Sequence, residues 1–308
     1  MSEIGAPKQG PHGPMNIGEE AKPTFAVLPN PSVLFLNRSK RLAALAPKHE
    51  LEPYLKFLAA LTRAQHDILA DLPEPALPPL DQITKALAHG MPPVSRASFE
   101  PDDVAALTVE RLLARLASEP VPEATATAIS ALREVTPAEG RQLILGALKD
   151  PSGEDDLARR VLLLAGLQVH FTRLATMLAA NDLKPVADGA CPVCGSAPMT
   201  SSVVGWPKAH NTRFCACSLC GTMWNVVRIK CVLCSSTGGI RYHEIEGKPD
   251  TIKGETCDTC HSYVKILYQV NDAALDPLAD DVASLGLDIL LIGEGWKRGG
   301  QNPFLMGY

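Results

Sequence analysis

Residues 191–200 read CPVCGSAPMT and contain the first two cysteines of a chain that has nine. All nine lie between positions 191 and 260, and eight of them form four Cys-x-x-Cys pairs. Each cysteine of the first two pairs has a counterpart 40 residues later, so the motif CxxC-x22-CxxC occurs twice. An internal repeat of this kind indicates one structural unit used twice.

The spacing within each pair is typical of metal ligands. Two residues between cysteines let both sulfurs of one turn face a single ion, and a second turn completes a tetrahedron of sulfurs. A crossed pairing, which joins 217 and 220 to 231 and 234, is one alternative, and a single cluster of eight is another. Thioredoxin-like redox pairs would need a βαβ setting, which the sequence lacks. The pairing that preserves the repeat predicts a first site of Cys191, Cys194, Cys217 and Cys220 and a second of Cys231, Cys234, Cys257 and Cys260.

Four thiolates suit either zinc or iron. Zinc would be structural, because four protein ligands leave no open position for a substrate. Iron in the same cage would resemble a rubredoxin site and could take up one electron. Between residues 191 and 270 basic side chains outnumber acidic ones, and we expect this surplus to offset the negative charge of the thiolate sites.

One cysteine and three histidines of this region fall outside the pairs. Cys215 stands two residues before the third paired cysteine, and its counterpart in the repeat is Glu255. It could exchange with a ligand or react with a partner, but we favour a free thiol beside a β-turn. Because each site already has four sulfurs, we expect the histidines near the sites or on the surface rather than as ligands; they are His210, His243 and His261.

The rest of the sequence argues against several classes of protein. Apolar residues make up 46% of the 308 residues, which is enough for ordinary buried cores, and the formal net charge of −5 argues against general polyanion binding. No apolar run reaches the length of a membrane span, and the first residues lack a secretory signal, so we expect a cytoplasmic protein without membrane insertion. Cytoplasmic thiols stay reduced, which favours metal over disulfides. The motifs of hydrolases, phosphate-binding loops and zinc proteases are missing, and no enzyme is predicted.

The chain divides by composition into four parts. Residues 1–24 predict a mobile tail, and residues 25–185 have the three- and four-residue apolar spacing of an all-helical domain. Residues 186–229 and 230–308 predict two tandem rubredoxin-like lobes, each with a small antiparallel sheet, the second followed by a helix and an irregular tail. The fold class is therefore α+β. Helices are predicted near residues 81–89, 101–118, 122–135, 137–149, 154–180 and 275–292.

Basic residues do not form a recognisable binding motif. The stretch NRSKRLAAL (37–45) places Arg38 and Arg41 one helical turn apart, and we expect both to be solvated helix charges rather than an anion site. A nucleic-acid platform is the usual alternative for a basic zinc ribbon. Little positive charge remains for phosphates here, so no nucleic-acid partner is expected.

Several stretches of the chain resemble the family of formate dehydrogenase accessory proteins called FdhE. The resemblance covers nearly the whole chain after residue 30 and is most specific from residue 191 onward. The matching stretches are CPVCGSAPMTSSVV (191–204), FCACSLCGTMWNVVRIKCVLC (214–234), CDTCHSYVKILYQ (257–269), ADDVASLGLD (279–288) and NPFL (302–305), with a less specific match at PYLKFLAALTRAQ (53–65).

The resemblance implies a cytoplasmic protein that respiratory formate dehydrogenase needs to become active, and that contacts the catalytic subunit without being part of the enzyme. It also implies iron in two rubredoxin-like sites held by the eight paired cysteines. The family's glycine after a second cysteine is present as Gly195 and Gly221, but Ser235 and His261 replace it in the second site. No family role transfers to Cys215. A rubredoxin-like electron carrier and a zinc-ribbon nucleic-acid binder are the other functions compatible with the cysteines.

Overall fold

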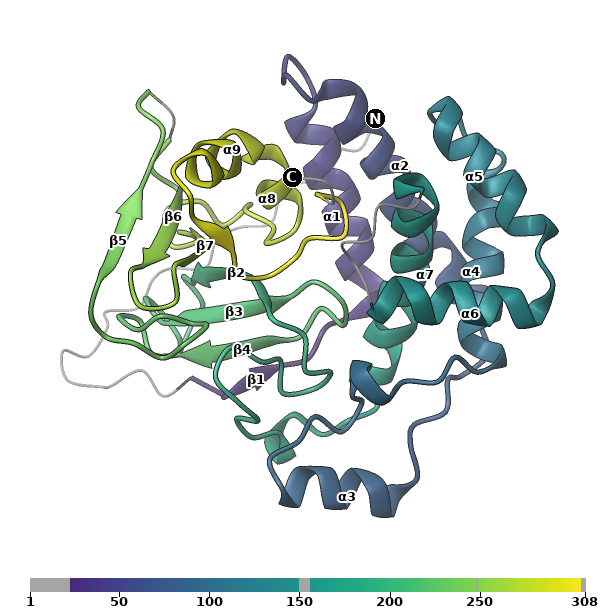
Figure 1. The fold of residues 1–308 in the computed structure, drawn as a ribbon, viewed down its shortest axis with the longest axis horizontal. Helices are drawn as coiled ribbons and strands as arrows, with labels where there is room; N and C mark the ends of the chain where they lie inside the picture. Colours follow the sequence, from purple (N-terminus) through teal and green to yellow (C-terminus); the bar gives the residue numbers. More distant parts are fainter. Residues whose placement is uncertain (1–22, 150–155, 248, 306–308) are drawn as a thin grey trace, which may run out of the picture.

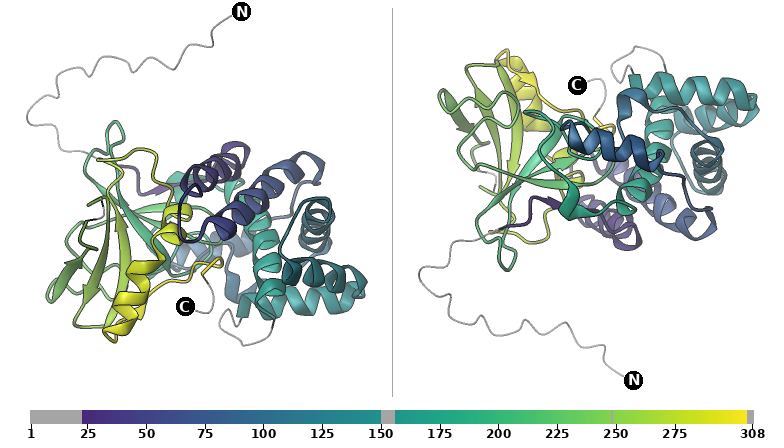
Figure 2. Two further views of the ribbon diagram at one scale, coloured as in Figure 1. Left: turned by 90° about the horizontal axis from the view of Figure 1, so that it is seen from above. Right: turned by 90° about the horizontal axis from the view of Figure 1, so that it is seen from below.

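The computed structural model describes residues 23–149, 156–247 and 249–305. Most of the predicted tail, the predicted start of the helix over 154–180 and residues 306–308 lie outside these ranges. In the described part, helices gather on one side of the molecule and one twisted sheet forms the other side, with the C-terminal segment packed against it (Figure 1). Two further views show the same division (Figure 2).

The helices of the N-terminal part begin at local signals in the sequence. Asn30 caps the first helix, where its Oδ1 accepts the N–H of Ser32 at 3.1 Å and Pro31 takes the first helical position. Asp102 accepts the N–H of Ala105 and caps the fourth helix in the same way. The five helices predicted between residues 81 and 180 are all present. The helices are α1 Pro31–Leu45, α2 Glu52–Asp67, α3 Leu80–Ala88, α4 Asp103–Leu116, α5 Glu123–Glu134, α6 Pro137–Lys149 and α7 Leu157–Thr176, with short 3-10 turns at Ile68–Asp71, Arg96–Ser98 and Ala180–Asp182.

Helix α7 is the centre of the helical part. Residues 161–172 are all buried, and α2, α4, α5 and α6 pack around them. Gly166 lets α4 approach closely, because a Cβ at this position would lie 2.7 Å from Cγ2 of Val109. Within the described residues, none of the helices is both long and apolar enough to cross a membrane.

His170 on α7 is a titratable group inside this core. Its side chain is 1% exposed, and its ring packs against the rings of Phe99 and Phe171 at centroid distances of 5.6 and 6.2 Å. Burial lowers the pKa of His170 to about 4, with Asp102 opposing the shift and Arg173 adding to it. The neutral ring is therefore the form that the folded protein accommodates.

Acid should destabilise the protein through His170. An unfolded histidine takes up its proton near pH 6.5, whereas the folded ring stays neutral to about pH 4, so stability falls as the pH drops between these values. Between pH 7 and pH 4.5, we expect His170→Leu to remove about 2 kcal/mol of this pH dependence. Denaturant unfolding followed at pH 7 and pH 4.5 in both proteins measures the difference, and acid release of metal is common to both. If both proteins lose the same free energy of unfolding between pH 7 and pH 4.5, His170 is not the group responsible.

One mixed sheet runs through the C-terminal part in the order β1-β4-β3-β2-β7-β6-β5, with β8 also paired to β7. Pairing is antiparallel except between β2 and β7 and between β7 and β8. The strands are β1 Ala26–Val27, β2 Pro198–Val203, β3 Arg213–Cys217, β4 Met223–Val226, β5 Ile240–His243, β6 Ile252–Cys257, β7 Ser262–Leu267 and β8 Lys297–Arg298.

The sheet contains the sequence repeat. Strands β2, β3 and β4 form an antiparallel unit around the first two Cys-x-x-Cys pairs, and β5, β6 and β7 form its counterpart around the last two. The predicted α+β class is confirmed. The two small sheets are joined into one, because β2 of the first unit pairs in parallel with β7 of the second. Strand β1 of the N-terminal part covers the outer edge of β4.

Two short helices replace the single helix predicted over 275–292, so that prediction is wrong in detail. They are α8 Ala279–Ala283 and α9 Leu285–Gly293, separated at Ser284. The break has a visible cause: Nζ of Lys265 on β7 donates to the carbonyl oxygens of Asp281 and Ser284 at 2.8 and 3.1 Å. The same ammonium is fully buried and also pairs with Asp288, while Arg298 pairs with Asp281.

Arg38 and Arg41 are not solvated helix charges, and that prediction is wrong. Arg41 forms an ion pair with Asp280 at 2.6 Å, and Arg38, which is 5% exposed, pairs with Asp276 at 3.4 Å. Their partners are more than two hundred residues away in the sequence, Asp276 just before α8 and Asp280 within it. These pairs attach α1 to the C-terminal segment.

Candidate metal centres

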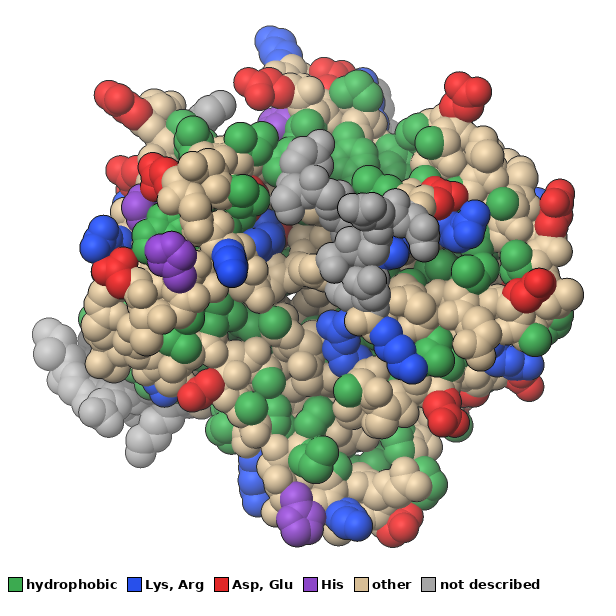
Figure 3. Space-filling model, in the orientation of Figure 1, with side chains coloured by type: hydrophobic (Ala, Val, Ile, Leu, Met, Phe, Trp, Pro, Cys, Tyr) green, Lys and Arg blue, Asp and Glu red, His purple; other side chains and the backbone are tan. Residues whose placement is uncertain are grey.

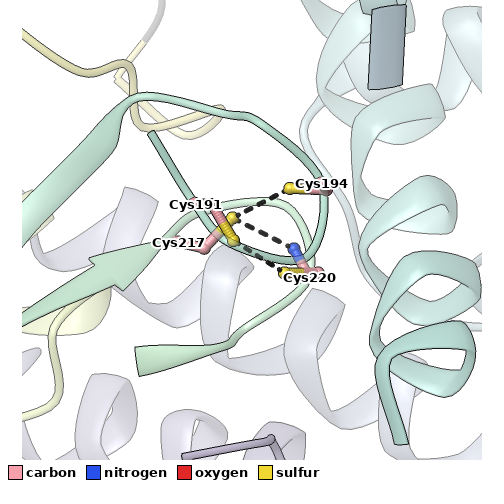
Figure 4. Close-up of side chains that lie close together, drawn as sticks. All are labelled: Cys191, Cys194, Cys217 and Cys220. Carbon is pink, nitrogen blue, oxygen red and sulfur yellow. Dashed lines mark hydrogen bonds between the residues drawn. The ribbon is translucent and has the colours of Figure 1, made fainter. Parts of the chain in front are cut away.

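The first four paired cysteines converge between the sheet and the helical part. Two of them lie in the loop before β2, a third ends β3, and the fourth lies in the turn before β4. The Sγ atoms of Cys191 and Cys220 are 3.5 Å apart, and those of Cys194 and Cys217 are 3.4 Å apart (Figure 4). All four Sγ atoms lie within 4.8 Å of one another, and none of these cysteines is in a disulfide.

The second four cysteines form a matching cluster at the other end of the repeat. The Sγ atoms of Cys231 and Cys260 are 3.8 Å apart, and those of Cys234 and Cys257 are 3.7 Å apart. A tetrahedral ion with metal–sulfur distances near 2.3 Å needs sulfurs about 3.8 Å apart. Both clusters fit such an ion, and the cysteines are grouped as the repeat predicted. The crossed pairing and the single cluster of eight are wrong.

The first cluster is sealed by its surroundings. Cys191, Cys194 and Cys220 are fully buried, and Cys217 is 3% exposed. The segment after α3 packs onto one of its turns, with hydrogen bonds from Val94 N–H to the carbonyl of residue 193 and from the N–H of residue 96 to the carbonyl of Cys194, each 3.0 Å. On the other turn, the side-chain amide of Gln168 on α7 donates a hydrogen bond to the carbonyl oxygen of residue 218.

The second cluster lies near the surface. Cys231 and Cys257 are buried, but Cys234 and Cys260 are only partly buried. Burial raises the pKa of Cys231 to about 12. Burial also opposes ionisation of Cys257, yet backbone N–H groups of residues 260 and 259 and the neighbouring thiols bring its pKa down to about 7. The two clusters thus share geometry but differ in access to solvent.

Hydroxyl groups near the sulfurs are a feature that the sequence analysis missed. Ser196 Oγ lies 3.2 Å from Cys194 Sγ, and Thr222 Oγ1 lies 3.2 Å from Cys220 Sγ. In the second cluster the corresponding hydroxyls bond to backbone oxygens instead. A signal was present, because a serine or threonine stands two positions after the second cysteine of every pair; these residues are Ser196, Thr222, Ser236 and Ser262.

Cys215 belongs to neither cluster. It lies within β3, opposite Ser201 of β2 and Trp224 of β4, and it is fully buried. The prediction of a thiol beside a β-turn is therefore wrong, because β3 continues through this position with strands on both sides. Burial raises the pKa of Cys215 to about 12, so the thiol stays protonated and unreactive.

The three histidines near the paired cysteines, and two basic residues of the same region, lie outside both clusters. His210 is exposed, His243 forms a hydrogen bond with Thr256 Oγ1 at 3.0 Å, and the ring of His261 packs at a tilt against that of Trp296, with the centroids 4.8 Å apart. None of the three joins a cysteine cluster. The expected offset of thiolate charge by basic residues is wrong for Arg213 and Lys265, which are buried in ion pairs with carboxylates.

The residue after the second cysteine has a left-handed backbone in all four turns. The φ angles are 76° at Gly195, 72° at Gly221, 63° at Ser235 and 55° at His261. Ser235 N–H donates to the carbonyl of residue 231 at 3.0 Å, much as Gly195 N–H donates to that of residue 191 at 2.9 Å. The second cluster therefore keeps the turn geometry at some cost in strain, because side chains disfavour this region.

Ser235→Gly should stabilise the second cluster. Glycine adopts φ near +63° without a steric penalty, and the side chain of Ser235 makes no hydrogen bond in the described structure. We expect a gain of about 0.5–1 kcal/mol in the free energy of unfolding of the metal-loaded unit. Gly195→Ser is the reverse change and should destabilise the first cluster, with an added steric cost because a Cβ there lies 3.2 Å from Cγ of Pro92. A destabilised Ser235→Gly protein would contradict the assignment of strain to this turn.

Comparisons with known proteins agree with this architecture. The sequence models of the FdhE N-terminal, central and C-terminal domains match residues 23–188, 190–228 and 229–305. A protein named "Protein FdhE homolog" from Rhizobium meliloti (strain 1021) is 39% identical over 297 residues, covering 96% of this chain and 97% of the relative. "Protein FdhE" of Escherichia coli (strain K12 / DH10B) is 33% identical, with 88% of each chain covered.

A solved structure shows the same fold. The crystal structure of the FdhE protein from Pseudomonas aeruginosa matches with a TM-score of 0.82 and 31% identity, covering 92% of this chain and 99% of that one. The three domain models follow one another along the chain, and the relatives match it nearly end to end. On these grounds, the chain belongs to the FdhE family.

Proposed function

We propose that this protein is an accessory factor required for the assembly or activation of respiratory formate dehydrogenase, and that it binds the catalytic subunit of that enzyme in the cytoplasm. Membership of the FdhE family over nearly the whole chain supports this role. The observation that carries it is a scaffold with two four-sulfur clusters, one sealed and one near the surface. We propose that this scaffold serves as a binding surface rather than as a reaction site.

We also propose that the eight paired cysteines hold two iron ions. The sulfur separations of 3.4–3.8 Å suit a tetrahedral ion, and an all-sulfur donor set suits iron or zinc. Bound iron would supply one-electron chemistry. The chain itself would exclude water from the first ion through Cys191, Cys194 and Cys220, and leave the second partly open at Cys234 and Cys260.

An electron carrier is the second candidate function. The partly exposed sulfurs of Cys234 and Cys260 favour it, because electron exchange with a partner needs a short path to the surface. Iron that is reversibly reduced at the second cluster would support this function, whereas a protein filled with zinc would exclude it.

A complementation experiment tests the proposed function. Deletion of the gene in its host should abolish formate dehydrogenase activity, and a plasmid copy should restore it. Cys217→Ser should fail to restore activity, since it removes one ligand of the sealed cluster. Cys215→Ser is the matched control, because it changes a buried cysteine two positions away that lies in neither cluster. A deletion strain with full formate dehydrogenase activity would refute the proposal, and about two irons per purified chain would support the metal assignment.

A further inference from the structure

The outer edge of β5 is an open edge of the sheet. In the ranges that the structure describes, no strand pairs with it, and β5 lies at the rim of the molecule (Figure 1). The carbonyl of Gly239 accepts the N–H of Asp258 at 2.9 Å, so Gly239 directs its backbone toward β6. Successive residues of a strand alternate in direction, and Ile240 and Tyr242 therefore present their N–H and C=O groups to the open side.

The equivalent edge in the first unit of the repeat pairs with a further strand. Tyr242 pairs with Glu255, and Ser201 pairs with Cys215, which is the repeat counterpart of Glu255. Tyr242 thus occupies in the second unit the place that Ser201 occupies in the first. In the first unit this edge is filled, because Ser201 pairs in parallel with Ile266 of β7. The equivalent edge of the second unit lacks the corresponding strand in the described structure.

The side chains at the open edge also indicate a partner. Ser201 is fully buried beside β7, whereas Tyr242 is 45% exposed. Ile240 is only partly buried and pairs with Cys257, a member of the second cluster. The space-filling view shows further hydrophobic side chains on the surface in the region of α9 (Figure 3), where Ile289 and Leu290 are more than half exposed. A strand added to β5 would cover Tyr242, and next to Ile240 it would reach the end of the sheet that carries Cys257 of the second cluster.

We propose that an extended segment of the partner polypeptide adds to β5 as a parallel strand. Its main chain would bond to the outward N–H and C=O groups of Ile240 and Tyr242, as β7 bonds to β2 in the first unit. The proposal rests on the proposed function for the identity of the partner, the catalytic subunit of formate dehydrogenase. It adds the place and the mode of binding, at the end of the sheet that carries the second cluster.

Affinity measurements on two variants of one residue test the main-chain contact. Tyr242→Pro removes an outward N–H that β6 does not use, and an edge strand tolerates proline. We expect this variant to bind the purified catalytic subunit about tenfold more weakly than Tyr242→Val, which also lacks the ring but keeps the outward N–H. Both variants should keep the metal content and melting temperature of the wild type, which shows that the fold is intact. Equal affinity of Tyr242→Pro and Tyr242→Val would overturn the proposal.

Crosslinking provides a test that requires no disruptive substitution. A photoreactive phenylalanine at position 242 should crosslink to the catalytic subunit, and the linked peptide should be one extended segment. The same group at Leu80, which is 77% exposed on α3, is the control and should give no crosslink. Crosslinks from 242 to a second copy of this chain would overturn the proposal in favour of self-association.

The two proposals fail in different ways. If the catalytic subunit binds the wild type but neither crosslinks at 242 nor responds to Tyr242→Pro, the β5 inference is wrong and the accessory function stands. If the catalytic subunit does not bind the full-length, metal-loaded protein at all, the proposed function fails with it.

Discussion

Chelation is expected to remove the two metal ions at very different rates. The second ion should leave quickly, because Cys234 and Cys260 are reachable from solvent. The first should leave only when the packing between sheet and helices opens, since residues 94 and 96 and helix α7 bond directly to its two turns. If that opening costs about 4 kcal/mol more, release from the first cluster is on the order of a thousandfold slower.

Substitutions at equivalent cysteines of the two clusters identify which cluster releases its ion in the fast phase and which in the slow phase. Cys217 and Cys257 each end a strand and differ by 40 positions, so each substitution by serine removes one equivalent ligand. Cys257→Ser should leave only the slow phase and should spare the unfolding of the helical part. Cys217→Ser should leave only the fast phase and should lower the free energy of unfolding of the helical part, because metal binding at a structural site contributes to folding. The measurement is release from the cobalt-loaded protein into excess chelator, followed by absorbance.

Two results would contradict this asymmetry. A single release phase in the wild type would show that both ions leave through the same opening. Loss of the fast phase in Cys217→Ser would show that the sealed cluster is the labile one. The zinc and iron forms should keep the same order of release, since the order depends on burial and not on the ion.

The metal clusters were predictable from the sequence because their determinants are local. Each Cys-x-x-Cys turn places two sulfurs by itself, and the 40-residue repeat then limits which turns combine. The same locality made helices such as α4 predictable, because the apolar spacing that indicates a helix and the cap at Asp102 both lie within the segment itself. The left-handed turns at Ser235 and His261 follow from the same repeat, although their residue types do not favour that conformation.

Contacts between distant segments were not predictable. Nothing near Arg41 indicates that Asp280, 239 residues later, will bind it, so the arginine looked like an ordinary surface charge. The parallel pairing of β2 with β7 joins the two units, and nothing in the sequence of either edge strand identifies its partner. Cys215 was misplaced for a related reason, because its burial depends on β2 and β4 lying on either side of β3.

Among the described residues, the joint between the two units contains the most completely buried arginine pair, and breaking it should be costly. Arg213 of β3 donates to both carboxylate oxygens of Glu255 on β6, at 2.7 and 2.9 Å, and also to Ser201 Oγ. The two charged side chains are 0% and 3% exposed. Removal of one partner leaves the other as an uncompensated buried charge. We therefore expect Arg213→Met to lower the free energy of unfolding by about 3–5 kcal/mol.

The double variant Arg213→Met, Glu255→Leu separates the cost of an unpaired charge from the value of the pair. Apolar side chains of similar size often replace a buried ion pair with little loss, so the double variant should recover most of the stability that Arg213→Met loses. Urea unfolding of the wild type, the two single variants and the double variant, each loaded with metal at both clusters, gives the coupling free energy of the pair. If the double variant is as unstable as the single one, the pair is needed for its geometry: the bidentate contact would then be what fixes the register between the two metal-bearing units, and apolar packing could not replace it.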